Sequence, residues 1–393
     1  MDQIKRFVDC AVPVLTCNLR CPYCFITQER KFLSELPQFA YSPETIGRAF
    51  APERWGGLLH INMGGSGETL LPSEMTPILY EVLKQGHYIA VVTNGTVTKR
   101  FQEICQFPEE FRKRLLFKIS FHYLELARLK MLDRFFDNIQ MLRDAGCSFS
   151  LELTPDDYYI PHIDDIQKIC MERVGAPCHV TVARKETDPD LPILTDLSRE
   201  DYLKTWGAFN SELFKFKMQT FNVKRKEFCY AGDWSTYLNL GTGILKQCYC
   251  GRAIQNIFDN PDEPIRWAAI GANCPEPHCY NAHAWMTLGT LPAVETPSYA
   301  SMRDRVTVTG DHWLQPEMRE FIGGQLKTLN PEYDEAQKKA VNRKEGLKIG
   351  LSYKIRKAAK KVFYCLPKDT RAKLFHHVWG KRSKLLQRLW YNK

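Results

Sequence analysis

The stretch Thr16-Cys17-Asn18-Leu19-Arg20-Cys21-Pro22-Tyr23-Cys24-Phe25 follows an apolar run of strand length at residues 11–16. Its cysteines are spaced C-x3-C-x2-C on a predicted loop. Thiolates bind soft metals, and this close spacing suits one compact iron–sulfur cluster better than the paired ligands of a zinc ribbon. Three protein ligands leave one iron of a cubane open to a further ligand. The alternative interpretation is a zinc ion or three buried thiols.

Five more runs of strand length follow, at residues 58–63, 88–93, 116–121, 148–153 and 179–183. Helical patterns separate them, most clearly at residues 72–85 and 132–145. Strands that alternate with helices predict an α/β fold with a parallel sheet, either doubly wound or curled into a barrel. Both arrangements place ligands at the carboxyl ends of the strands, so the residues after each strand are candidate site residues.

The second predicted strand ends in Met63-Gly64-Gly65-Ser66-Gly67-Glu68-Thr69-Leu70. Glycines let a backbone approach a ligand closely, and a neighbouring carboxylate can pair with an ammonium group. Thr93-Asn94-Gly95-Thr96 follows the third strand, and a plain turn is its other interpretation. Ser120 and Glu152 lie near the ends of the fourth and fifth strands, as ligand contacts or as solvated polar residues.

Composition sets the protein class. The chain has 393 residues, of which 44% are hydrophobic and 25% charged, as in ordinary globular proteins of two or three domains. No apolar run reaches the ~18 residues of a membrane span, and the N-terminus lacks a secretory signal. We therefore expect a cytoplasmic protein whose fourteen cysteines are thiols or metal ligands, not disulfides.

The cysteine loop and the Gly-Gly-Glu segment resemble those of the radical S-adenosylmethionine (SAM) superfamily. This resemblance implies a partial (β/α)6 barrel in which Cys17, Cys21 and Cys24 hold a [4Fe–4S] cluster whose open iron binds SAM. Reductive cleavage of SAM then gives a 5′-deoxyadenosyl radical that abstracts a substrate hydrogen. An electron donor such as a flavodoxin or ferredoxin is also implied. The implied SAM contacts are Tyr23, Gly64, Gly65, Ser66, Gly67, Glu68, Thr93, Asn94, Ser120 and Glu152.

A second group of cysteines begins at Cys229. Thirteen residues separate Cys229 from Gly243, and four more separate Gly243 from Cys248. Residues 235–240 and 244–247 predict a hairpin that would bring Cys229 and Cys248 together. With Cys274 and Cys279, four thiolates would close a [4Fe–4S] site or a structural zinc site.

This segment resembles the SPASM or twitch extension of radical SAM enzymes. Its first half matches, whereas a full SPASM domain has more cysteines after Cys274 and Cys279, so the resemblance implies one auxiliary [4Fe–4S] cluster. Cys250 is surplus. It either replaces a ligand or donates a hydrogen atom to a substrate radical, and the second role would make the enzyme an epimerase.

The formal net charge of +9 arises from the C-terminal end of the chain. Residues 351–393 hold thirteen basic side chains and one acid, whereas the first 350 residues hold 41 basic and 44 acidic ones. Helical spacing at residues 354–366 and 371–390 predicts two basic amphipathic helices around Pro367. Such helices favour anionic lipid, on the inner membrane face, or pack on the protein's own body. We consider nucleic acid an unlikely partner.

The predicted organisation has four parts. They are a partial barrel at residues 1–220, an auxiliary-cluster domain at 221–290, an annex of loops and helices at 291–350 and a basic tail at 351–393. We expect a radical SAM enzyme that oxidises or epimerises a carbohydrate, an aminocyclitol or a glycan precursor. The chain begins almost at its first strand, which leaves no room for an N-terminal peptide-binding domain. The alternatives are a peptide- or protein-modifying maturase and a zinc-stapled nucleic-acid-binding protein.

Overall fold

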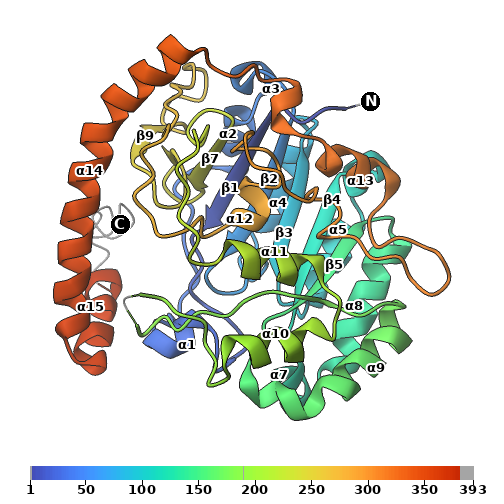
Figure 1. The fold of residues 1–393 in the computed structure, drawn as a ribbon. Helices are drawn as coiled ribbons and strands as arrows, with labels where there is room; N and C mark the ends of the chain where they lie inside the picture. Colours follow the sequence, from blue (N-terminus) through green and yellow to red (C-terminus); the bar gives the residue numbers. More distant parts are fainter. Residues whose placement is uncertain (1, 189, 381–393) are drawn as a thin grey trace.

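A single nine-stranded sheet organises the computed structural model, which describes residues 2–188 and 190–380 (Figure 1). The strand order is β6-β5-β4-β3-β2-β1-β7-β8-β9, and β1 to β6 are parallel. The strands are β1 Arg6–Val12, β2 Leu59–Gly65, β3 Tyr88–Thr93, β4 Leu115–Phe121, β5 Ser148–Leu153, β6 His179–Val180, β7 Ser235–Asn239, β8 Ile244–Lys246 and β9 Ala253–Asn256. The predicted α/β fold, with six parallel strands that alternate with helices, is confirmed.

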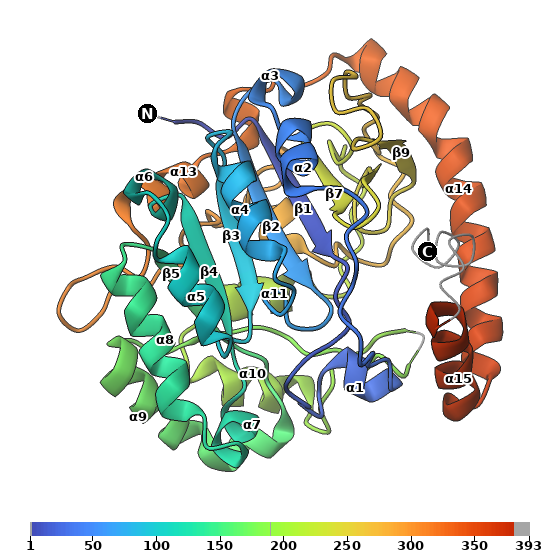
Figure 2. The same ribbon diagram turned by 180° about the vertical axis from the view of Figure 1, so that it is seen from behind.

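Helices cover both faces of the sheet. Figure 2 looks onto the outer face, which is covered by α2 Pro43–Ala49, α4 Met75–Leu83, α5 Thr98–Ile104 and α8 Leu132–Asp144. In Figure 1 the inner face lies behind α11 Glu212–Thr220 and α12 Ala282–Trp285. The remaining helices are α1 Phe25–Glu29, α3 Pro52–Trp55, α6 Glu109–Arg112, α7 Tyr123–Arg128, η1 Asp157–His162, α9 Ile163–Val174, α10 Arg199–Gly207, α13 Pro316–Gly323, η2 Leu326–Thr328, α14 Glu335–Cys365 and α15 Lys368–Gly380.

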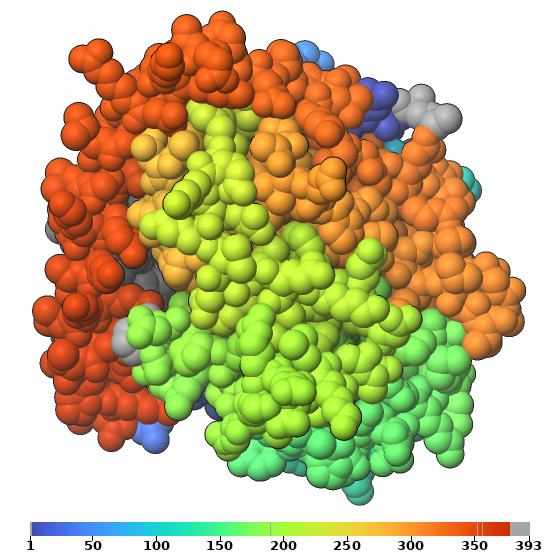
Figure 3. All heavy atoms as spheres, in the orientation of Figure 1, coloured from blue at the N-terminus to red at the C-terminus, as the bar shows by residue number. Residues whose placement is uncertain are grey.

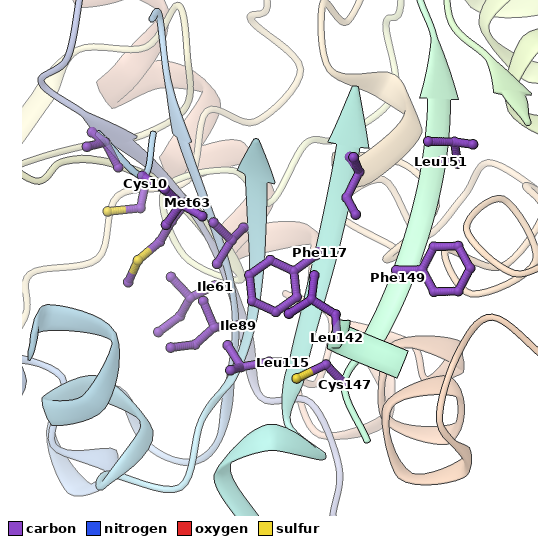
Figure 4. Packing of buried hydrophobic residues seen from close by; sticks show 14 of the residues in the cluster. Cys10, Ile61, Met63, Ile89, Leu115, Phe117, Leu142, Cys147, Phe149 and Leu151 are labelled. Atoms are coloured by element: carbon purple, nitrogen blue, oxygen red, sulfur yellow. The ribbon is translucent and has the colours of Figure 1, made fainter. Parts of the chain in front are cut away.

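Strand side chains alternate between two cores, because successive residues point to opposite faces. On the outer face Ile61, Phe117 and Leu151 pack with Leu142 of α8 (Figure 4). On the inner face the amino ends of the strands are apolar or aromatic, and Phe7 meets Trp285 edge-on at 5.5 Å between ring centroids. Towards the carboxyl ends of the strands the inner face carries charged side chains, among them Asp9, Lys118 and Glu152.

The first strand lies earlier than predicted. It spans Arg6–Val12 and not residues 11–16, because its polar residues find partners in distant parts of the chain. Arg6 pairs with Asp233 at 3.2 Å, and Asp9 accepts hydrogen bonds from Asn62 and Asn281, both at 2.9 Å. The sixth strand is shorter than predicted, at His179–Val180.

The predicted hairpin is confirmed, and it extends the same sheet. Strand β7 pairs parallel with β1, and β8 returns antiparallel to β7. The turn needs a left-handed residue, which Gly243 supplies at φ +72°, and its N–H donates to the carbonyl of Asn239 at 2.8 Å. The segment that carries the second group of cysteines is therefore anchored directly beside the first strand.

The C-terminal strap, defined here as residues 335–380, runs along one flank of the molecule (Figures 1 and 3). Helix α14 begins at Glu335 and not at residue 354 as predicted, because Asp334 and Gln337 form a reciprocal capping box. It ends at Cys365, just before Pro367, as the sequence predicts. The second predicted helix, at residues 371–390, extends beyond residue 380 and so lies partly outside the described residues. Among the described helices, none is both long enough and apolar enough to cross a membrane.

Both helices of the strap are docked on the body. Glu345 of α14 is buried and pairs with Arg252 at 2.8 Å. Arg371 of α15 lies 3.5 Å from the buried carboxylate of Glu29. Phe375, only 2% exposed, lies against the first helix of the chain and the loop after it.

Candidate active site at the carboxyl edge of the sheet

The first three cysteines lie together in the segment between β1 and α1. Cys24 precedes the first turn of α1, and its N–H donates to the carbonyl of Cys21 at 3.2 Å. Burial raises the pKa of the Cys17 thiol to about 11, and it also raises the pKa of Cys21 and Cys24. The neighbouring sulfurs of Cys17 and Cys24 add to the rise at Cys21, so these thiols lie close enough to repel one another as thiolates.

The turn after β3 braces this cysteine loop. Asn94 donates through Nδ2 to Asn18 Oδ1 at 2.8 Å and to the sulfur of Cys17 at 3.7 Å. Asn18 in turn donates to Thr96 Oγ1 at 2.8 Å. Asn94, predicted as a SAM contact or a turn residue, therefore lies beside Cys17. Asn18 was not predicted as a site residue, although it lies inside the cysteine motif.

The glycines after β2 let two backbone segments approach each other. A Cβ at Gly67 would lie 2.1 Å from the carbonyl oxygen of Thr16, and one at Gly65 would lie 2.2 Å from Val14. The N–H of Gly67 donates to Val14 O at 2.8 Å. The glycines were expected to admit a ligand, but Gly65 and Gly67 are required here for loop-to-loop packing. Gly64, Gly65 and Ser66 also line a cavity.

Glu68 is buried and joins two of the site's loops. Its Oε1 accepts from Thr93 Oγ1 at 2.6 Å and from Leu70 N at 3.0 Å, and its Oε2 accepts from Asn94 N at 2.6 Å. Burial raises the pKa of Glu68, and these three donors oppose the rise. Thr69 stands where the resembling family commonly has proline, and its Oγ1 accepts from Gly65 N at 2.9 Å.

Tyr23, expected near the adenine of SAM, is buried in a small network. Its hydroxyl lies 2.5 Å from His122 Nδ1 and accepts from Tyr159 at 3.1 Å. Burial lowers the pKa of His122 to about 4, so the imidazole is neutral at pH 7. The network supports the cysteine loop through Tyr23, so His122 has a structural role here.

Ser120 and Glu152 are opposite one another in the pairing of β4 with β5. Glu152 Oε1 pairs at 2.5 Å with Nη1 of Arg303, whose side chain is fully buried. Burial disfavours the carboxylate, but Arg303, followed by Lys118 and Lys217, lowers the pKa of Glu152 to about 2. Arg303 was not predicted, because 151 residues separate it from Glu152 and no motif marks it.

A cavity of about 500 Å³ opens at this edge of the sheet. Its walls come from β1, from the glycine loop, from the hairpin segment and from the strap. The lining includes Asp9, Gly64, Gly65, Ser66, Phe25, Tyr237, Asn239, Tyr249, Cys250, Asn281 and Phe375. The structure thus brings the surplus Cys250 and the strap residue Phe375 to the same space as the glycine loop.

The second group of cysteines surrounds a smaller cavity of about 60 Å³, which Cys229, Cys248, Cys250, Cys274 and Cys279 all line. Burial raises the pKa of Cys248 to about 12. It also raises the pKa of Cys229, where Cys274, Cys248 and Cys279 add to the effect. Five thiols thus line one space, one more than the four that a [4Fe–4S] cluster takes.

In the described residues, neither cysteine group has its side chains arranged to bind one metal ion. Among residues 2–188 and 190–380, no three Cys, His, Asp or Glu side chains form a site for one metal ion. The sulfurs that hold a cubane are spaced more widely, because each binds a different iron. By chemistry, both groups offer the thiolate donors that iron–sulfur clusters take.

Comparison with known proteins assigns part of the chain to a known domain. Residues 12–155 match the sequence model of the radical SAM superfamily, so this part of the chain is a radical SAM domain. The described fold, an α/β sheet with a radical SAM domain followed by a helical region, agrees. No curated protein sequence matches the chain.

Several solved structures are similar to the chain. Streptococcus suis SuiB is 14% identical with a TM-score of 0.44, covering 66% of this chain and 67% of its own. The enzyme anSMEcpe, solved with bound AdoMet, is 14% identical with a TM-score of 0.42, covering 65% and 79%. BtrN, in complex with AdoMet and 2-DOIA, is 13% identical with a TM-score of 0.30, covering 66% and 81%.

Glu68→Gln should destabilise the protein before any ligand binds. An amide presents a donor to either Asn94 N or Leu70 N, so one buried N–H loses its acceptor at a cost of about 1–3 kcal/mol. The free energy of urea unfolding measures this loss. The exposed Glu110→Gln is the matched control and should change that free energy by less than ~0.5 kcal/mol. Equal stabilities of the two variants would contradict the assigned role of Glu68.

Proposed function

We propose that this protein is a radical SAM enzyme that removes a hydrogen atom from a substrate carbon. Cys17, Cys21 and Cys24 would hold a [4Fe–4S] cluster, which supplies the electron for reductive cleavage of bound SAM. The observation that carries the proposal is the placement of this cysteine loop beside Glu68, Asn94 and the 500 Å³ cavity.

The chain's own residues position the reactants and exclude water. Glu68 and Asn94 fix the glycine loop against the cysteine loop, so the cysteines that would hold the cluster lie on a rigid support. Phe375 and Phe25 present aromatic rings to the cavity. A carbon radical needs such shielding from solvent, and the strap supplies part of it.

We further propose that Cys229, Cys248, Cys274 and Cys279 hold an auxiliary [4Fe–4S] cluster of the SPASM or twitch type. The small cavity that all four line supports this assignment. A structural zinc ion is the alternative. External electrons would come from a flavodoxin or ferredoxin.

The proposed substrate is a small carbohydrate, aminocyclitol or glycan precursor. A cavity of about 500 Å³ has the size of a small-molecule site. The rings of Tyr237 and Tyr249 offer apolar faces, and Asn239 and Asn281 offer hydrogen bonds to hydroxyl groups. A peptide or protein substrate is the alternative.

Cys250 defines the reaction class within this proposal. It lines the same cavity as the glycine loop, and in an epimerisation its S–H would return a hydrogen atom to the substrate radical on the face opposite abstraction. The S–H bond breaks, a C–H bond forms, and one external electron with one proton restores the thiol. That reaction is an epimerisation. In an oxidation the substrate radical loses an electron and needs no thiol, so Cys250→Ala separates the two classes.

Formation of 5′-deoxyadenosine tests the main proposal. The anaerobically reconstituted protein, reduced with dithionite, should convert SAM to 5′-deoxyadenosine, measured by liquid chromatography and mass spectrometry. Cys17→Ala removes one cluster ligand and should reduce the product to the level of a protein-free sample. Cys105→Ala removes a thiol outside both groups and should match the wild type. Product formation by Cys17→Ala at the wild-type rate would refute the assignment.

A second proposal concerns the outward face of α14, which we assign to an anionic lipid surface at the inner membrane face. Its apolar side chains fall on one stripe by helical spacing, with exposures of 83% at Leu347, 64% at Leu351, 61% at Ile355 and 67% at Val362. Exposed lysines flank the stripe at positions 344, 348, 354 and 361. The opposite face of α14 packs on the body, so docking and lipid binding use different faces.

Sedimentation with phosphatidylglycerol vesicles at low salt tests the lipid proposal. The double variant Leu351→Asp/Ile355→Asp should stay in the supernatant, because it places two acids on the stripe. Val308→Asp changes an apolar residue that is 75% exposed elsewhere, and it should sediment like the wild type. Sedimentation of the double variant with the wild type would overturn the proposal. Truncation at residue 351 is a poorer test, because it also removes Phe375 from the cavity.

A further inference from the structure

The inner face of the sheet carries charged residues that the proposed chemistry does not use. Lys118 of β4 donates to Asn62 Oδ1 at 3.2 Å, and Asn62 donates to Asp9. Two more cations reach this face from elements that cover it. Lys217 of α11 donates to Thr181 Oγ1 at 2.5 Å, and Arg303 pairs with Glu152.

We infer that Lys118, Lys217 and Arg303 form an anion-binding subsite that holds a phosphate or carboxylate group of the substrate. The inference rests on the proposed function, because the subsite would orient the substrate of that same cavity. It names a substrate class that the cysteine motifs alone do not indicate.

The charge balance of the inner face supports the subsite. Glu152 balances Arg303, but Lys118 and Lys217 have neutral hydrogen-bond partners, Asn62 and Thr181. Within the described parts of the chain, no carboxylate lies within 4.0 Å of either ammonium group. A buried cation without a counterion is costly, and an anionic ligand would remove that cost.

The surroundings of Lys217 show the same excess of positive charge. Burial lowers its pKa to about 7; Glu152 opposes this shift, while Arg303, Arg184 and Lys118 add to it. The neighbouring His283 has a buried Nδ1 without a hydrogen-bond partner in the described residues. Burial lowers the pKa of His283, and Lys217 and Arg303 lower it further. The imidazole therefore remains neutral and contributes no additional positive charge.

Hydrogen bonds link the wall of the cavity to Lys118. Lys217 and Glu152 keep part of their surface accessible although α11 covers this face of the sheet. Asn281 donates to Asp9, and both residues line the 500 Å³ cavity. From Asp9 the hydrogen bonds continue through Asn62 to Lys118. The cations and this wall of the cavity therefore share the inner face of the sheet and one hydrogen-bond network.

Calorimetric titration tests the subsite with two probes, inorganic pyrophosphate and malonate, on reconstituted wild-type protein saturated with SAM. Binding of one probe is expected, and the probe that binds distinguishes a phosphate from a carboxylate substrate. Lys217→Gln should weaken that binding at least tenfold, whereas Lys217→Arg keeps the charge and should retain it. Lys215→Gln is the matched control, since Lys215 is exposed on the same helix and should not affect binding.

Three outcomes would overturn the subsite: neither probe binds the wild type, Lys217→Gln binds as tightly as the wild type, or Lys217→Gln and Lys217→Arg lose binding together. Measuring 5′-deoxyadenosine in the same wild-type sample separates this inference from the proposed function. Anion binding that depends on Lys217 without 5′-deoxyadenosine would refute the radical chemistry and leave the subsite intact. The reverse result would refute the subsite alone.

Discussion

The buried carboxylate of Glu68 is the interaction on which the site depends. Three parallel strands end side by side, and the loops that follow them carry polar backbone groups that are removed from water. One carboxylate satisfies Leu70 N, Asn94 N and the Thr93 hydroxyl, so two loops share a single acceptor. Through Asn94 the same arrangement reaches the sulfur of Cys17. The position of the cysteine loop therefore depends on the hydrogen bonds that hold the loops after β2 and β3 together.

The strap links the two cysteine groups mechanically. Helix α14 contacts the segment of the second group through Glu345 and Arg252, and α15 contacts α1 beside the first group through Arg371 and Glu29. The hairpin adds a second link, because β7 pairs directly with β1. Both cysteine groups are therefore tied to one sheet, and Phe375 closes part of the space that lies next to Cys250.

Local patterns in the sequence predicted the fold well. Strands β3 and β5 have the predicted bounds, since their buried apolar residues form uninterrupted or alternating runs. The first strand was misplaced because Arg6 and Asp9 break that pattern and are satisfied only by distant partners, Asp233 and Asn281. The cysteine motifs were visible because their spacing is short. Arg303 and Phe375 could not be predicted as site residues, because only the tertiary fold brings them to the inner face and the cavity.

The metal content of the reconstituted protein tests the central claim most directly, namely that both cysteine groups are cluster sites. The account predicts about eight irons per chain for the wild type, with matching sulfide. It predicts about four irons for the triple variant Cys17→Ala/Cys21→Ala/Cys24→Ala, because the auxiliary group is unchanged. One or two zinc ions per chain without iron would contradict it.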